Sequence, residues 1–256
     1  MTCITGRHSH LFASAAFILL SGACSGPGAA SQTWDYEVMG VFVRSLTSSV
    51  PQQYSDFIEQ DQSVNVVVHE WDRWEPRDIV ENLRANEQLR QAIAQAEVIT
   101  YDFAFDWQDM PQTLFVAGFC GGSDGQDCLR EGLQEAQQDW SDILDLIAEL
   151  RGESPVLLRI LIQGDWFYDW KFMDNMTPEQ QGILVEYYRQ FQAFALQDAR
   201  SRGIPIVLAF PEPYFNETYP PLDYLQSDEI HFSEAGSLVI AQQLRETGYE
   251  FTTLGD

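Results

Sequence analysis

Short apolar segments of strand length alternate with longer segments of helical periodicity along most of this chain, and this alternation limits the fold more than any other feature. Strand-like runs rich in β-branched and other apolar residues are expected at 38–43, 64–68, 97–103, 156–162 and 204–210. Strands joined through helices run parallel in one sheet, with the helices covering its faces. The sequence therefore predicts an α/β protein of three layers (α/β/α) with a five-stranded parallel sheet.

The helical segments between these runs have apolar residues at three- and four-residue steps. They are expected at 51–61, 76–93, 129–150, 178–202 and 233–245. Pro76 suits the first turn of its helix, Gly203 can close the fourth helix, and Ser233 can cap the last. Two segments fit the alternation poorly, namely the loop 120–128 and the aromatic stretch 165–173. Both can lie near the carboxyl edge of the sheet, as a packed cap or as a wall facing a ligand.

The first residues indicate export. An apolar run of ten, residues 11–20, follows Arg7, His8 and His10. It is shorter than the roughly 20 residues that cross a bilayer, and it suits the core of a signal peptide. We expect a signal peptide at 1–23, a tether at 24–35 and one domain at 36–256.

The end of the leader allows two forms of the mature protein. Leu20-Ser21-Gly22-Ala23-Cys24 is similar to a bacterial lipoprotein signal, in which Cys24 would be lipidated and anchor the chain to a membrane. Cleavage after Ala30 would instead release a secreted protein. Both forms place the domain outside the cytoplasm.

The cysteines agree with export. Cys3 and Cys24 belong to the leader, so Cys120 and Cys128 are the only pair in the body. The loop between them is polar and rich in glycine, and an oxidising compartment favours a disulfide there, worth roughly 2.5 kcal/mol in the chain-entropy model. No third or fourth ligand stands nearby, so we expect no zinc or other metal.

The charge limits the partners. The chain has 39 acidic and 14 basic residues, a formal net charge of −25. Such a surface repels phosphate backbones and anionic lipid, which excludes nucleic acid and leaves a lipid anchor as the only expected link to a membrane. We expect a monomer.

One histidine has a setting suited to catalysis. Serine-dependent acyl transfer needs a nucleophile, a histidine base and an acid that orients the base. Beyond the leader only His69 and His231 are available, and His69 follows a strand-like run where a structural role is expected. Asp228 precedes His231 by three residues, so one short turn can hold its carboxylate against one imidazole nitrogen and leave the other for a serine.

The residues around His231 resemble a known family. Asp228 to Gly236, opening a final amphipathic helix, is similar to the last signature block of the SGNH (GDSL-like) hydrolases, and Ser45-Leu46-Thr47 resembles the end of their nucleophile block. The segments 54–59 and 120–131 also resemble that family, the latter a disulfide loop of one exported bacterial branch. The resemblance covers about 36–250. It implies a flavodoxin-like fold and ester hydrolysis by Ser45, His231 and Asp228 without metal or organic cofactor.

The sequence departs from the family at three blocks. Val43-Arg44 replaces the Gly-Asp before the nucleophile, and a second register, with Gly40 as the block's glycine, leaves no nucleophile. Residues 70–76 lack the expected oxyanion glycine, and Asp106 stands where the family has an oxyanion Asn. An ionised carboxylate there would repel a developing oxyanion.

Two functions are therefore open. One is a serine ester hydrolase acting outside the cytoplasm on a small-molecule, glycan or lipid ester. The other is a binding lipoprotein that keeps the SGNH fold for a glycan or lipid ligand without cleaving it.

Overall fold

The computed structural model describes residues 32–40, 49–71, 76–103, 110–163, 176–209, 222–226 and 232–254. The chain divides into residues 1–30 and a compact unit of residues 31–256, and every described residue lies in the second. Ser45, Asp106, Asp228, His231 and Cys24 lie outside the described residues, as does the aromatic stretch 165–173.

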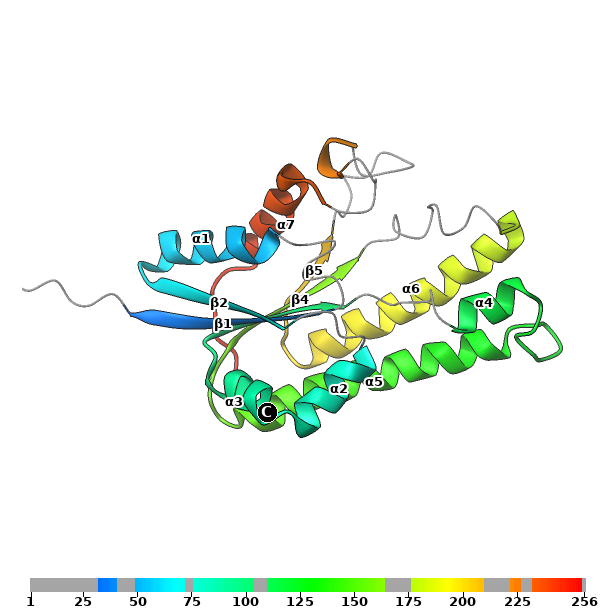
Figure 1. Ribbon diagram of the computed structural model, residues 1–256, viewed down its shortest axis with the longest axis horizontal. Coiled ribbons are helices and arrows are strands. Elements are labelled where there is room, and N and C mark those ends of the chain that lie inside the picture. The colour runs from blue at the N-terminus through cyan, green and yellow to red at the C-terminus, as the bar shows by residue number, and fades with distance from the viewer. Residues whose placement is uncertain are drawn as a thin grey trace, which may run out of the picture. The chain divides into compact units, whose positions relative to one another are not determined.

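The sheet has five parallel strands (Figure 1). They are β1 (Thr33–Gly40), β2 (Asn65–Trp71), β3 (Val98–Phe103), β4 (Leu157–Gln163) and β5 (Ile206–Ala209), in the order β2-β1-β3-β4-β5. The predicted parallel sheet is confirmed. β1 begins at Thr33 rather than at residue 38, because Trp34 and Tyr36 are already buried in the core.

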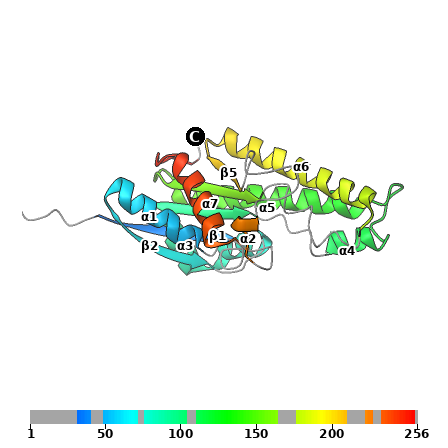
Figure 2. The same ribbon diagram turned by 90° about the horizontal axis from the view of Figure 1, so that it is seen from above.

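The helices form a layer on each face of the sheet (Figures 1 and 2). On one face α1 (Val50–Gln62) packs against α7 (Glu234–Glu246), which follows the short 3-10 helix η3 (Leu222–Tyr224). The other face carries α2 (Pro76–Ala85), α3 (Glu87–Gln95), α5 (Asp127–Arg151) and α6 (Pro178–Ser201). The three-layer α/β/α prediction is confirmed.

One helical expectation was wrong in detail, and one short helix was missed. The segment expected as one helix over 76–93 is two helices, because the Asn86 side chain accepts a hydrogen bond from Leu89 N and starts α3 as an N-cap. The short helix α4 (Met110–Val116), which packs against α5, was not predicted. Its seven residues are too few to establish a helical period in the sequence.

The two faces of the sheet contact their helices differently, one through aromatic packing and the other through hydrogen bonds of a buried arginine. Beneath α5 and α6, Phe103 stacks on Phe191 and meets the edge of the Trp140 ring, all three being buried. Beneath α7, buried Arg159 donates from Nε to Thr247 Oγ1 at 2.6 Å and from Nη2 to Gly248 O at 2.8 Å. A buried guanidinium without such partners would be very costly in free energy. Arg159 therefore needs these bonds, and they connect β4 to the end of α7.

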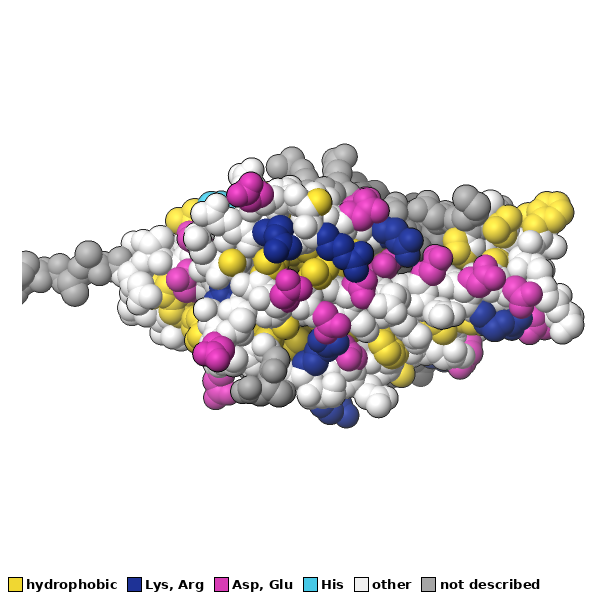
Figure 3. Space-filling view, turned by 90° about the horizontal axis from the view of Figure 1, so that it is seen from below, with side chains coloured by type: hydrophobic (Ala, Val, Ile, Leu, Met, Phe, Trp, Pro, Cys, Tyr) yellow, Lys and Arg dark blue, Asp and Glu magenta, His cyan; other side chains and the backbone are white. Residues whose placement is uncertain are grey.

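The surface over α2, α5 and α6 carries its arginines beside carboxylates (Figure 3). Arg84 pairs with Asp142 at 2.6 Å, and Arg202 bridges Asp145 and Asp198 at 2.6 and 2.9 Å. Ion pairs at the protein surface contribute little stability each, about 0–1 kcal/mol. The chain has few cationic side chains, and these arginines already pair with carboxylates of the protein itself.

Candidate active site

The strand order places a topological switch point between β1 and β3. From β1 the chain goes to β2 on one side, and β3 begins the other half of the sheet, so α1 and α5 cover opposite faces. In sheets of this kind ligands bind at the carboxyl ends of the two strands at the switch point. Residues 41–48, with Ser45, leave the end of β1, and residues 104–109, with Asp106, leave the end of β3.

Gly40 ends β1 at the switch point and aligns with Asp102 of β3. A Cβ on Gly40 would lie 2.6 Å from the Asp102 carbonyl oxygen and 2.7 Å from Asp102 Cβ, and Gly40 has φ +152°. Only glycine fits here. Asp102 itself is 5% exposed, so a carboxyl group is buried at the base of the edge where both loops begin.

Residues 227–231, with Asp228 and His231, are flanked by a hydrogen-bonded frame. Leu225 and Phe232 form an antiparallel bridge, and Gln226 Nε2 donates to Phe232 O at 2.9 Å. Ser233 N donates to Tyr224 O at 2.9 Å. The frame therefore holds together the two ends of the segment that contains the Asp-x-x-His motif.

Ser233 caps α7, as predicted. Its Oγ accepts from Gly236 N at 3.2 Å and donates to Asp223 O at 2.8 Å. A Cβ on Gly236 would lie 2.2 Å from Tyr224 O, so glycine is required where the first turn of α7 meets η3. Sequence reasoning noted Gly236 as part of a motif without finding this packing.

One contact joins the elements that flank the two candidate segments. Gln53, in the first turn of α1, donates from Nε2 to the backbone oxygen of Glu234, the first residue of α7, at 3.3 Å. The segment with Ser45 leads into α1, and the segment with His231 leads into α7. The structure thus brings together the described flanks of both segments, at the carboxyl edge of the sheet.

Two further candidate groups lie on the neighbouring strands β1 and β2. His69 Nε2 lies 3.8 Å from Asp35 Oδ1, and both side chains are about half exposed (47% and 52%), which suits a surface pair rather than a base. Trp71, the last residue of β2, donates its indole N–H to Glu37, which is 3% exposed, and burial raises the pKa of the Glu37 carboxyl. Sequence reasoning missed Glu37 because one acidic residue in an apolar strand carries no motif.

Cys120 and Cys128 form a disulfide with a Cα–Cα distance of 4.9 Å, so the predicted pairing is confirmed. Cys128 N also donates to Cys120 O at 3.0 Å, at the start of α5. Within the described ranges, no group of three or more His, Cys, Asp and Glu residues is arranged to hold a metal ion. In that same part of the chain, no helix has the length and apolar character to cross a membrane.

Comparison with solved structures identifies the fold. A lipase from a goat rumen metagenome matches with a TM-score of 0.61 and 20% identity, over 84% of this chain and 98% of the lipase. An extracellular lipase from Streptomyces rimosus matches with a TM-score of 0.52 and 11% identity, over 82% and 99% of the two chains. An acetylxylan esterase from Geobacillus stearothermophilus matches with a TM-score of 0.50 and 13% identity, over 86% and 96%.

No protein-family model and no curated protein matches the sequence. The likeness is therefore one of structure, and it extends over nearly the whole length of the matched enzymes. Together with the five parallel strands and the two helical layers, it shows that this chain has the three-layer fold of the SGNH (GDSL-like) hydrolases, the family that its sequence resembles.

Proposed function

We propose that the protein is a serine ester hydrolase in which Ser45 is the nucleophile, His231 its base and Asp228 the acid that orients the imidazole. The observation that carries the proposal is the hydrogen bond from Gln53 to Glu234, because it joins the helices into which the Ser45 and His231 segments lead. The solved structures of similar fold, which are named as lipases and an acetylxylan esterase, support the same reaction class.

The reaction proceeds by acyl transfer in two steps. Ser45 Oγ attacks the ester carbonyl while His231 accepts the hydroxyl proton, and His231 then gives that proton to the departing alcohol. Water, deprotonated by His231, attacks the acyl-serine, and the acid leaves as Ser45 regains its proton. Asp228 stays ionised and stabilises the imidazolium.

Asp106, at the position of the family's oxyanion Asn, should make this reaction slow. The oxyanion of the tetrahedral intermediate needs hydrogen-bond donors, and removing one donor costs about 100- to 1,000-fold in rate. An ionised carboxylate at the donor position adds repulsion. We expect Asp106→Asn to raise the rate of ester hydrolysis, because a neutral amide can donate.

A fluorophosphonate probe tests the nucleophile directly. An activated serine displaces fluoride from the phosphorus and forms a stable phosphonate ester, and a serine without a base does not. Mass spectrometry of the digested protein should place the adduct on Ser45, and His231→Ala should abolish it. An adduct on another residue, or none in the wild type, contradicts the proposal.

The second candidate function is a binding protein with this fold and no hydrolysis. The packing of Gly40 favours this second function. Only glycine fits at this position at the end of β1, as expected if Gly40 is the glycine of the family's nucleophile block. Val41 and Phe42 then stand at the next two positions, and neither can act as a nucleophile. Absence of the phosphonate adduct would favour this function.

We also propose that the protein works outside the cytoplasm on an extracytoplasmic ester. The disulfide supports this, since such bonds persist in oxidising compartments. Mass spectrometry of the mature N-terminus separates the two forms: a diacylglyceryl group on Cys24 means a membrane-anchored lipoprotein, and an unmodified chain starting at Ser31 means free secretion.

A further inference from the structure

The two longest helices of the described residues extend beyond the sheet on the side of the candidate active site. α5 has 25 residues and α6 has 24, so each is about 36–38 Å long at 1.5 Å per residue. β4, with 7 residues, is about 23 Å long. Both helices begin on the carboxyl side of the sheet, and Figure 1 shows their first turns, with α4, projecting past the strand ends.

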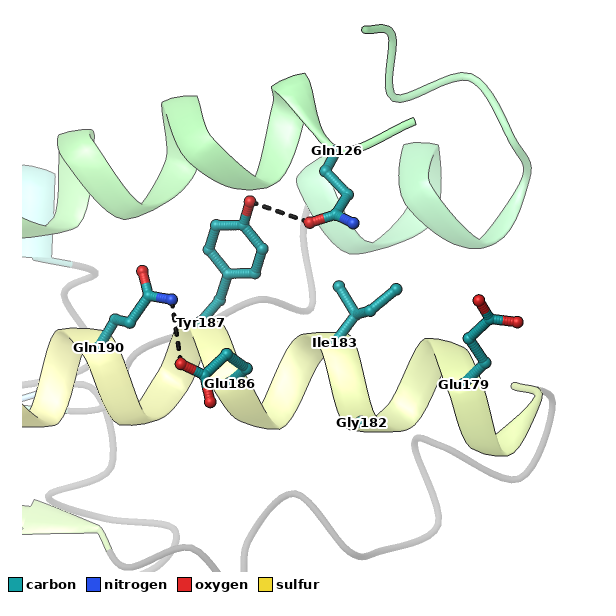
Figure 4. A pocket seen from close by; sticks show the side chains of 7 residues that line it. All are labelled: Gln126, Glu179, Gly182, Ile183, Glu186, Tyr187 and Gln190. Carbon is teal, nitrogen blue, oxygen red and sulfur yellow. Dashed lines mark hydrogen bonds between the residues drawn. The ribbon is translucent and has the colours of Figure 1, made fainter. Parts of the chain in front are cut away.

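A groove of about 320 Å³ lies between these projecting ends. This volume is at the lower end of the range for ligand sites, about 300–1,000 Å³. One face of α6 and Gln126, the residue just before α5, line it (Figure 4). Its lining residues are Gln126, Glu179, Gly182, Ile183, Glu186, Tyr187 and Gln190.

Hydrogen bonds among the lining residues organise the groove. Tyr187 OH donates to Gln126 Oε1 at 3.2 Å, which fixes that amide and leaves its Nε2 as a donor of known orientation (Figure 4). Gln190 Nε2 donates to Glu186 Oε1 at 3.2 Å, which leaves the amide oxygen of Gln190 and the second carboxylate oxygen of Glu186 as acceptors. The groove thus presents both donors and acceptors, as a hydroxyl group requires.

The charges of the groove exclude anionic ligands. Among the described residues, its lining contains Glu179 and Glu186 and no lysine or arginine. Arg130, on the first turns of α5, is held by Asp124, at 2.9 and 3.0 Å, and by Asp127. A phosphate or carboxylate would be repelled by these two carboxylates and would find no cation among the described lining residues, whereas a neutral polyhydroxyl compound would meet none of this repulsion.

We propose that this groove is a binding subsite for a neutral, hydroxyl-rich oligosaccharide, and that the ester cleaved at the carboxyl edge is carried by such a chain. The cleavage part of this inference rests on the proposed function, whereas the binding part rests on the groove alone. Gly182, without a side chain, leaves room on α6 beside Glu179 and Glu186 for a sugar ring to approach.

Titration calorimetry with an unesterified cello-oligosaccharide of six units tests the binding without any catalysis. The double variant Glu186→Ala/Gln190→Ala should weaken binding at least tenfold relative to wild type, because it removes two of the groove's hydrogen-bonding side chains. It should fold normally, because both residues are exposed on α6 and Ala favours the helix. Gln197→Ala, an exposed glutamine of α6 outside the groove, is the matched control and should bind as wild type does. No binding by wild type, or equal binding by the double variant, overturns the proposal.

Kinetics then connects the groove to the active site. On an acetylated form of the same oligosaccharide the double variant should show a KM raised at least tenfold, with an unchanged kcat/KM for p-nitrophenyl acetate, which is too small to reach the groove. Equal KM values overturn the link to the ester. A wild type that binds the oligosaccharide but cleaves neither ester would refute the proposed function and leave the binding groove standing. Tighter binding of a glucosamine oligomer that is lost in salt would overturn the neutral ligand class.

Discussion

The Nε2 atom of Gln53 donates a hydrogen bond to the backbone oxygen of Glu234 at 3.3 Å, and this bond joins the first turns of α1 and α7. These turns follow the two segments that hold Ser45 and His231. A small relative movement of α1 and α7 would therefore change the separation of the proposed nucleophile and its proposed base, and misplacement by about 1 Å can cost about 100-fold in rate.

Gln53→Ala should lower kcat/KM for p-nitrophenyl acetate several-fold while reducing the free energy of unfolding by only about 0.5–1.5 kcal/mol, the usual net value of one hydrogen bond. Gln52→Ala is the matched control, because among the described residues the Gln52 side chain bonds within α1, to Ser55 Oγ and Asp56 Oδ1. Urea unfolding and initial rates on the same samples measure both effects. Equal losses of activity in the two variants would show that the α1–α7 contact does not position the site.

Two glycines should respond to the same substitution with opposite signs. Gly40→Ala places a Cβ against Asp102 and should destabilise the protein by about 1–3 kcal/mol, as overpacking of a core does. Gly182→Ala, in α6 with nothing within 4 Å of the new Cβ, should stabilise it by about 0.5–1 kcal/mol through helix propensity. Thermal unfolding of both variants checks the signs, and a neutral Gly40→Ala would mean that the end of β1 can shift.

The disulfide should act as a local staple. Replacing both Cys120 and Cys128 by Ser should lower the free energy of unfolding by roughly 2.5 kcal/mol, the value expected for closing a loop with a sequence separation of 8. Dithiothreitol should destabilise the wild type by a similar amount and leave the double variant unchanged. Two titratable thiols in wild type purified under oxidising conditions would contradict the pairing.

The buried carboxyl of Glu37 makes stability depend on pH. Burial raises its pKa above the ordinary value of 4.5, so the folded state keeps a proton that the unfolded state has already released. The contribution to stability is full below about pH 4.5 and is lost as the pH rises through the raised pKa of the folded state.

Glu37→Gln removes this titration and keeps an acceptor for the Trp71 indole N–H. The free energy of unfolding of the variant, relative to wild type, should therefore increase between pH 4.5 and pH 8. Urea unfolding of both proteins at the two pH values measures this difference. The titration of the other carboxyl groups affects both proteins equally and therefore cancels. A difference that is constant with pH would mean that Glu37 titrates normally in the folded state.

The sheet and its main helices could be predicted because the burial that shapes them also spaces the apolar residues. The strand at 98–103 is buried at every position, and α5 repeats apolar residues on one face from Leu129 to Leu150. The capping by Ser233 is equally local and was predicted. The break at Asn86 and the short helix α4 depend on a single cap and on tertiary packing, and neither leaves a periodic signal.

The candidate site was predictable only in part, for a physical reason. Asp228 and His231 stand three residues apart, so a local sequence pattern can reveal them as a candidate pair, and the described residues on either side form a hydrogen-bonded frame before α7. The contact of Gln53 with Glu234 spans 181 residues of sequence, and no local pattern encodes it. The clash that reserves Gly40 for glycine depends equally on strand β3, which lies 62 residues away.

The most direct test of the account is the rate of p-nitrophenyl acetate hydrolysis by Ser45→Ala beside wild type. Ser49→Ala is the matched control, since Ser49 stands four residues further on and its side chain makes no capping hydrogen bond to α1. We predict a measurable rate for wild type and for Ser49→Ala, and a loss of at least 1,000-fold for Ser45→Ala, because triad members act as a unit. Full activity in Ser45→Ala, or no hydrolysis above buffer by wild type, would contradict the assignment of Ser45 as the nucleophile.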